Sequence, residues 1–185
     1  MTNVWLTADT HFGHRNIIKY CNRPWETSEE MDAALFKNWN DTIKQNEVVY
    51  FLGDLTLSSN PEIIKSILSR LNGIKYLIKG NHDRLTNQQY RDCGFKEVYD
   101  YPIIYKEFFI LSHAPVFMDD TMPYVNIHGH THQNNQPNKK CFNVSVENIG
   151  YKPIDIKQII KHFEQFDKIQ NEHQSSETIE TPNEN

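Results

Sequence analysis

An alternation of strand-like and helix-like segments in the N-terminal half constrains the fold most strongly. Short, nearly continuous apolar runs occupy residues 4–8, 47–52 and 75–79, as expected of strands buried on both faces. Two segments with apolar residues at helical spacing, 28–44 and 61–71, separate these runs. Strands that alternate with helices pair in parallel through helical crossovers. The sequence therefore predicts an α/β domain built on a parallel sheet.

Both predicted helices carry recognisable start signals. Thr27 and Glu30 form a capping box, in which the threonine hydroxyl accepts from a backbone N–H and the glutamate reaches back to another. Pro61 stands at the first position of the second helix, where its missing N–H costs nothing. Gly73 follows the end of that helix. These signals place the helix boundaries independently of the apolar pattern.

The second half of the chain changes character. Strand-like segments follow one another at 95–105, 108–111, 124–127 and 141–146, with no helical pattern between them. Consecutive strands without helical crossovers predict a second, largely antiparallel sheet. The expected fold class is thus α/β with two sheets.

The C-terminal part contains one more helix and a polar tail. Ile156, Ile159, Ile160 and Phe163 recur at helical spacing and predict a closing helix. Residues 168–185 have almost nothing to bury, so we expect a disordered tail there, after a single domain of residues 1–167.

The composition excludes several classes of protein. No apolar run reaches the length that spans a bilayer, and the N-terminus lacks the features of a secretory signal, so a cytoplasmic location without membrane attachment is expected. Cys21, Cys93 and Cys141 form no C-x-x-C pair, which argues against a disulfide framework and a cysteine zinc site. The net charge of −5 and the absence of a basic run argue against stable binding of duplex DNA. The oligomeric state cannot be predicted.

Ligand-type residues follow the ends of the apolar runs. Segment 127–132 contains three histidines spaced two residues apart, and neutral imidazole binds borderline metals that also accept oxygen ligands. Similar residues end the other runs: Asp9, His11, Asp54, Asn81, His82 and His113. A structural zinc site is closed by four ligands, and this set is larger. It favours two metal ions, with the lone carboxylate of Asp54 as the bridge.

These residues resemble the signature blocks of calcineurin-like metallophosphoesterases, in the order found in that family, across about residues 4–165. The blocks are Asp9-x-His11, Gly53-Asp54, Gly80-Asn81-His82-Asp83, Ser112-His113 and Gly129-His130-Thr131-His132. The stretch Asp-Thr-His-Phe-Gly-His, with Arg-Pro-Trp downstream, is similar to a subgroup of small bacterial and phage-borne phosphoesterases. The resemblance implies a four-layer αββα sandwich, with two mixed sheets flanked by helices.

The resemblance also implies two metal-ligand sets and two divalent ions. The first set is Asp9, His11 and His132, the second is Asn81, His113 and His130, and Asp54 bridges the two. Manganese is the ion we expect first, with iron, zinc, nickel or magnesium as alternatives.

The family's chemistry then assigns roles to two further residues. In the family, a hydroxide that bridges the metals attacks phosphorus, so no covalent enzyme intermediate is expected. His82 would contact the phosphate and protonate the leaving oxygen. Asp83 would support His82 and help to keep it charged.

Four residues near these blocks have two interpretations each. His14 and Arg15 follow the first block and could bind substrate, or they could be a hydrogen-bonded histidine and a solvated arginine at a helix start. Arg23 could anchor a phosphate, although a structural turn is the simpler interpretation. His128 has no role in the family's scheme, and its strand parity indicates a residue that supports a metal ligand, or a buried, hydrogen-bonded histidine, rather than a further ligand.

The predicted activity is hydrolysis of phosphate esters, with a preference for phosphodiesters of small, nucleotide-like substrates or a nucleic-acid end. The chain is short and lacks insertions that would cap the site. Phosphomonoesters, phosphorylated proteins included, are the nearest alternative. A non-catalytic interaction module of the same fold is a second. A metallo-β-lactamase-type hydrolase fits poorly, because its histidine run lies early in the domain and is followed by Asp-His.

Overall fold

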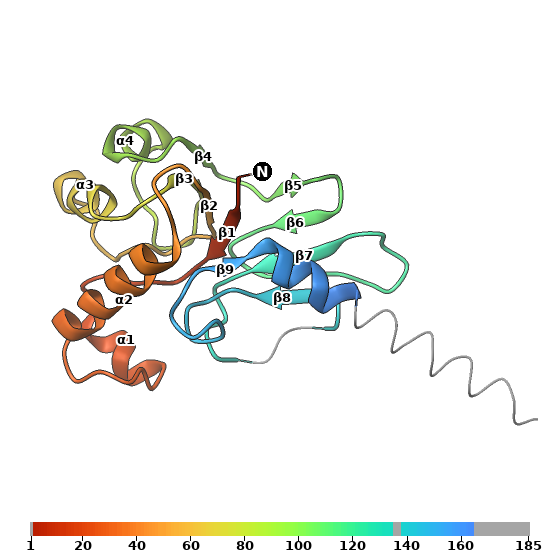
Figure 1. Cartoon of the computed structure of the whole chain (residues 1–185), viewed down its shortest axis with the longest axis horizontal. Helices are drawn as coiled ribbons and strands as arrows, with labels where there is room; N and C mark the ends of the chain where they lie inside the picture. Colours follow the sequence, from red (N-terminus) through yellow and green to blue (C-terminus); the bar gives the residue numbers. More distant parts are fainter. Residues whose placement is uncertain (1, 135–137, 165–185) are drawn as a thin grey trace, which may run out of the picture.

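The computed structural model describes residues 2–134 and 138–164, which form two sheets with helices outside them (Figure 1). The first sheet has the order β4-β3-β2-β1-β9, and the second has the order β5-β6-β7-β8. The strands of the first sheet are β1 (Val4–Thr7), β2 (Val48–Phe51), β3 (Ile74–Ile78), β4 (Glu97–Tyr99) and β9 (Ile154–Asp155). Those of the second are β5 (Ile103–Tyr105), β6 (Phe109–Leu111), β7 (Val125–His128) and β8 (Cys141–Asn143). The helices are α1 (Arg15–Tyr20), α2 (Ser28–Thr42), α3 (Pro61–Ser69) and α4 (Asn87–Cys93), and residues 156–164 are also helical. The tail predicted at 168–185 lies outside the described residues.

The first sheet is the predicted parallel one. Strands β1 to β4 pair in parallel, and β9 joins β1 antiparallel at the far edge. Helices α2 and α3 match the two predicted helices, and both bonds of the capping box between Thr27 and Glu30 are present. Helices α1 and α4 were not predicted, because six and seven residues are too few to establish a helical period. Strand β4 was predicted with the second sheet but pairs with β3 in the first.

The prediction that the second sheet is largely antiparallel was wrong. Strands β5 and β6 are antiparallel, but β6–β7 and β7–β8 are parallel. Segments 112–124 and 129–140 return the chain to the same end of the sheet as long connections. Because neither connection shows a helical pattern in the sequence, these crossovers were not recognised. They carry the Ser-His and Gly-His-Thr-His blocks.

Two apolar clusters fill the spaces between the layers. One joins the helices α1 to α4 to one face of the first sheet, with Val49 and Phe51 on its sheet side. The other lies between the two sheets and continues to the helix at 156–164, with Leu6 and Ile127 fully buried in it. In Figure 1 the four labelled helices lie beside the first sheet, and the C-terminal helix lies over the second. The layers therefore follow the αββα order.

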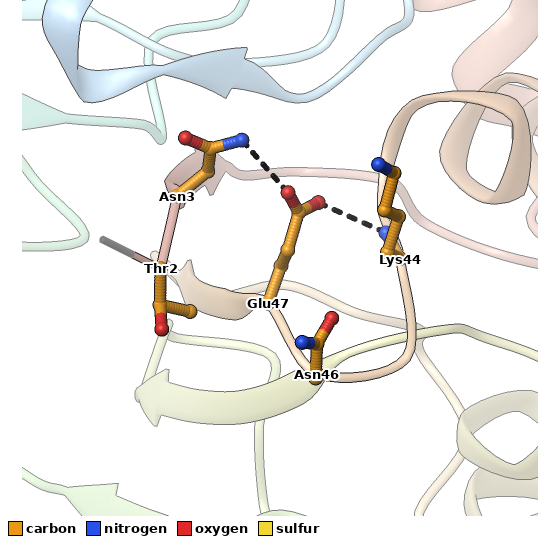
Figure 2. Close-up of a pocket in the computed structure, with 5 residues that line it drawn as sticks. All are labelled: Thr2, Asn3, Lys44, Asn46 and Glu47. Carbon is orange, nitrogen blue, oxygen red and sulfur yellow. Dashed lines mark hydrogen bonds between the residues drawn. The ribbon is translucent and has the colours of Figure 1, made fainter.

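A carboxylate anchors the amino end of the first sheet. Glu47, immediately before β2, accepts hydrogen bonds from the Asn3 side chain (2.8 Å), the Trp5 indole (2.9 Å) and the Lys44 backbone N–H (2.9 Å). Figure 2 shows Asn3 and Lys44 on either side of it, in a shallow pocket whose rim includes Thr2 and Asn46. The backbone N–H of Lys44, and less strongly the two side-chain donors, hold the pKa of Glu47 below its usual range.

Candidate metal centre

The predicted ligands converge because parallel strands end at a common edge. Asp9, Asp54 and Asn81 follow β1, β2 and β3, while His113 and His130 follow β6 and β7. Ala8 joins the two sheets at this edge: its N–H donates to Val144 (3.0 Å), and its carbonyl accepts from the Val146 N–H (3.1 Å). The loops of both sheets therefore meet over one site.

The backbone at this edge is unusual at most of the predicted ligands. Five of them have positive φ angles, which L-residues adopt rarely: Asp9 (58°), His11 (50°), Asp54 (61°), His130 (68°) and His132 (49°). Non-glycine residues in this region cost free energy and cluster at functional sites. Here the conformation turns each side chain out of its strand direction and toward the others.

The first predicted ligand set forms one cluster. Nitrogen or oxygen atoms of Asp9, His11 and His132 lie within 4.8 Å of one another. Oδ1 of Asp9 and both ring nitrogens of His11 are buried and have no hydrogen-bond partner in the described part of the chain. Burial lowers the pKa of His11 to about 2, so its imidazole is neutral, which is the metal-binding form. Buried polar atoms without partners are costly, and a cation between them would satisfy them.

The second predicted set forms a neighbouring cluster. Atoms of Asp54, His113 and His130 lie within 4.8 Å of one another, and Asn81 joins them, with Oδ1 2.9 Å from Nε2 of His113. Nδ1 of His113 lies 2.8 Å from the Leu52 carbonyl, to which it donates. Burial lowers the pKa of His113 to about 4, so in the neutral ring Nε2 is an acceptor. It faces the acceptor oxygens of Asn81 and Asp54, an arrangement that a cation would complete.

Asp54 lies between the two clusters. Its Oδ2 is 3.7 Å from Nε2 of His11 in the first cluster and 3.5 Å from Nε2 of His113 in the second. The other oxygen, Oδ1, accepts from the backbone N–H of His82 at 2.9 Å. This is the position that a bridging carboxylate requires. Nε2 of His82 is 3.9 Å from Oδ2 of Asp54, and the His82 side chain is 36% exposed.

Two glycines allow this close approach. A Cβ at Gly129 would lie 2.5 Å from Oδ2 of Asp9 and 2.5 Å from Cβ of Ala8. A Cβ at Gly80 would collide with the carboxylate of Asp54. Both positions belong to predicted blocks. Glycine is required there because any side chain would collide with a ligand carboxylate.

Comparison with known proteins identifies the family to which a chain with this arrangement belongs. Residues 2–178 match the family model described as calcineurin-like phosphoesterase. The chain belongs to this family. It is 42% identical over 177 residues to the uncharacterized protein MJ1445 of Methanocaldococcus jannaschii, a match that covers 89% of this chain and 93% of that protein. It is 36% identical over 85 residues to the gene 66 protein of Mycobacterium phage L5, of which the match covers 41%.

A solved structure shares the fold of this chain. The protein of unknown function AQ665 from Aquifex aeolicus superposes with a TM-score of 0.68 at 28% identity, over 87% of this chain and 99% of that one. Within the described ranges, no helix is long and apolar enough to cross a membrane. The αββα sandwich expected from the resemblance is confirmed.

The structure gives Asp83 a role different from the predicted one. Its carboxylate is buried and accepts from the backbone N–H groups of Asp54 (2.8 Å) and Gly80 (2.9 Å) through Oδ2. Oδ1 lies 3.4 Å from the Tyr90 hydroxyl. Among the described contacts, none joins Asp83 to the His82 imidazole. Asp83 therefore ties the Gly-Asp turn to the Gly-Asn-His-Asp turn, because its oxygens are used by backbone donors of both.

Arg23 is buried rather than open to substrate. Its side chain is 0% exposed, and its Nη1 and Nη2 donate to the carbonyls of Thr10 (2.8 Å) and Asp9 (2.7 Å). Nε and Nη2 also donate to Oε1 of Glu147, at 2.9 and 2.7 Å. A guanidinium engaged in this way cannot anchor a phosphate, which corrects the phosphate-binding interpretation. It holds the backbone of the first block in place.

Glu147 is a site residue that the sequence analysis missed. The same Oε1 lies 3.1 Å from Nδ1 of His132, which donates to it and leaves Nε2 unprotonated for a metal. Burial lowers the pKa of His132, but the hydrogen bond to Glu147 and the negative charges of Asp9 and Glu147 together outweigh burial, so the pKa is raised. Cys21, His132 and Glu147 also lie within 4.8 Å of one another, but Arg23 already supplies the positive charge there. We therefore do not count them as a metal site.

Ser145 is a second missed residue. Its hydroxyl donates to Oδ2 of Asp9 at 2.7 Å, and the His130 N–H donates to the same oxygen at 2.8 Å. Asn143, two residues earlier, donates to the His132 carbonyl at 2.8 Å. Burial raises the pKa of Asp9 to about 7, and a bound cation would favour its charged form.

The remaining residues singled out in the sequence lie in three different environments. His14 lines a cavity beside the clusters, and its ring centroid is 5.6 Å from that of His11. Arg15 is exposed and does not line that cavity. His128 is fully buried, with Nδ1 2.8 Å from the Gly129 carbonyl, as its strand parity predicted.

Proposed function

We propose that this protein hydrolyses phosphodiesters with two divalent metal ions. The observation that carries the proposal is the position of Asp54, whose Oδ2 lies within 3.7 Å of a histidine of each cluster. Without the shared Asp54, each set has three ligands, one fewer than the four of a closed structural site. Together they provide two open sites that share one carboxylate, the arrangement used for metal-assisted hydrolysis.

The donor set fits the predicted ions. In the proposed assignment Asp9, His11 and His132 hold one ion, and Asn81, His113 and His130 hold the other. Mixed nitrogen and oxygen ligands without a thiolate suit manganese, iron or zinc. Such ions, when bound, would activate water near neutral pH and neutralise charge on the phosphoryl group.

His82 is the proposed proton donor to the leaving oxygen. Its backbone is fixed by the N–H bond to Oδ1 of Asp54, and its ring lies at the edge of both clusters with access to solvent. It also lines the cavity beside them. A histidine side chain held in this way can act as the general acid.

Arg23 and Glu147 support the metal ligands without binding metal or substrate themselves. Glu147 fixes the tautomer and orientation of His132, and Arg23 balances the charge of Glu147 while holding the Asp9 carbonyl. These partners keep one ligand set in place before any ion binds.

The charge around the clusters favours diesters over monoesters. A monoester dianion is commonly bound by arginine or lysine as well as metal. The described residues that line the adjacent cavity contain neither, and Arg23 is fully engaged. A diester carries a single negative charge, which two cations can balance alone.

Metal content and hydrolysis, measured on one purified batch, test the proposal. We would assay bis(p-nitrophenyl) phosphate against p-nitrophenyl phosphate, with Mn²⁺ or with a chelator. Asp54→Asn is the test variant, and Asp100→Asn, at an exposed ion pair with Lys79, is the matched control. We expect manganese-dependent cleavage of the diester, lost in Asp54→Asn and kept in the control.

Two other results would redirect the proposal. Faster cleavage of the monoester would make the protein a phosphomonoesterase. A folded protein that binds no divalent ion would make it a non-catalytic module of this family.

A further inference from the structure

The cavity beside the metal-ligand clusters has a wall that the proposed reaction does not use. We call it the α1 cavity, and its volume is about 390 Å³. It is lined by His11, His14, Ile17, Tyr20, Cys21, His82, His132, Gln133 and Asn134. Histidines of the clusters form its inner end, and one side of helix α1 forms its outer wall. A substituent bonded to a phosphoryl group at the clusters can therefore extend directly into it.

The outer wall is apolar, with an aromatic ring at its rim. Ile17 and Cys21 are buried, while Tyr20 is 68% exposed. The Tyr20 ring meets the His14 ring edge-on, with centroids 6.3 Å apart at 74°. Such a ring offers a flat face on which a planar group can stack.

The two sides of the cavity are already tied together. The side-chain amide of Gln133, in the loop after the histidine run, donates to the Tyr20 carbonyl at 3.3 Å. The carboxamides of Gln133 and Asn134 add hydrogen-bonding groups to an otherwise apolar wall. Apolar surface with a few polar groups is typical of small-molecule sites, and the volume lies in their range of about 300–1,000 Å³.

The charge of the lining limits what can bind. None of the described lining residues is Lys, Arg, Asp or Glu. A substituent with further phosphates would lose hydration here, and the outer wall offers it no Lys or Arg in return. An uncharged planar ring would lose little and would stack on Tyr20.

We propose that the α1 cavity is the subsite for an uncharged planar ring on the substrate, a nucleobase of a nucleoside phosphodiester, with Tyr20 as its stacking platform. The inference rests on the proposed function, because it places the reacting phosphoryl group at the clusters. It also narrows the substrate, because the lining favours esters whose second substituent is uncharged.

Two diesters with the same leaving group test the subsite in the manganese-loaded enzyme. One is thymidine 5′-(p-nitrophenyl phosphate), and the other is methyl p-nitrophenyl phosphate. Tyr20→Ala should raise KM for the thymidine diester about tenfold, the effect of losing one base–aromatic stack, and leave the methyl diester unchanged. Tyr20→Phe should restore the wild-type KM. Tyr101→Ala removes a tyrosine that is 80% exposed between β4 and β5, and it should leave the KM of both diesters unchanged.

An equal effect of Tyr20→Ala on both diesters, or no effect on either, would overturn the subsite while leaving the hydrolase intact. Thymidine binding, measured by calorimetry on the metal-free protein, separates the two proposals. If wild-type protein cleaves neither diester, the proposed function fails. The subsite then stands only if thymidine binds and Tyr20→Ala weakens that binding.

Discussion

Replacing Arg23 by methionine should destabilise the protein strongly, although Arg23 touches neither substrate nor metal in the proposed mechanism. The side chains of Arg23 and Glu147 are 0% and 4% exposed, and the substitution leaves the Glu147 carboxylate buried without its cation. Breaking one partner of a buried ion pair costs about 3–5 kcal/mol. Two backbone carbonyls, those of Asp9 and Thr10, also lose their donor.

Chemical and thermal unfolding measure this cost. For a chain of this size, 3–5 kcal/mol corresponds to a fall in Tm of roughly 6–20 °C. Arg91→Met is the matched control, since Arg91 and Glu97 form a surface pair with the same 2.7 Å separation and side chains 36% and 43% exposed. Exposed pairs contribute about 0–1 kcal/mol, so the control should change Tm little.

The double variant Arg23→Met/Glu147→Gln tests the cause. Glutamine removes the buried charge and still accepts from Nδ1 of His132, so the double variant should be more stable than Arg23→Met alone. Additive losses in the double variant, or a loss in Arg23→Met as small as that in the Arg91 control, would refute the account of a coupled buried pair. Glu147→Gln alone should weaken metal affinity, because His132 loses its charged partner. Losing the partner of a metal ligand typically lowers metal affinity 10–100-fold.

Three further predictions concern other parts of the molecule. Gly129→Ala should lower both stability and metal affinity, because its Cβ would lie 2.5 Å from Asp9 Oδ2; titration with Mn²⁺ checks this, and unchanged affinity would contradict it. Glu47→Gln should be less stable than wild type at about pH 6, but the difference should shrink toward about pH 3.5. The pKa of Glu47 is lowered on folding, so its contribution is present above the unfolded value of 4.5 and lost as pH falls through the folded one. Urea unfolding at both pH values tests the sign, and a pH-independent difference would refute it. Mn²⁺ at about 100 times its Kd should raise the free energy of unfolding by about 2.7 kcal/mol, and Asp54→Asn should remove most of this gain.

The sequence was most informative where a residue's chemistry and its place at a strand end coincide. Asp9, Asp54 and Asn81 each follow a recognisable apolar run, and the family resemblance placed them in one site. The parallel order of the second sheet was missed because the sequences of its crossovers show no helical pattern. Nothing in their sequence distinguishes such connections from loops between antiparallel strands.

The residues that support the ligands were harder to find. Arg23 and Glu147 are 124 positions apart, so no local pattern relates them. Asn143, Ser145 and Glu147 do alternate with Val144 and Val146, a period of two that indicates one polar face. That pattern identifies a strand-like segment with a polar side. It does not reveal that the side faces Asp9 and His132, because the contact depends on the bridge between the two sheets at Ala8.

The positive φ angles of the five proposed ligands also limit which amino acids these positions can use. Asp, Asn and His are the non-glycine residues that tolerate this backbone region best. They are also side chains that offer oxygen or imidazole nitrogen to a cation. Backbone conformation and metal coordination thus favour the same few residue types. Glu, an equally good oxygen ligand, is absent from the five. An Asp→Asn exchange at these turns changes the charge and preserves the turn. Asp→Ala alters both, so its effect on activity cannot be assigned to the lost charge alone.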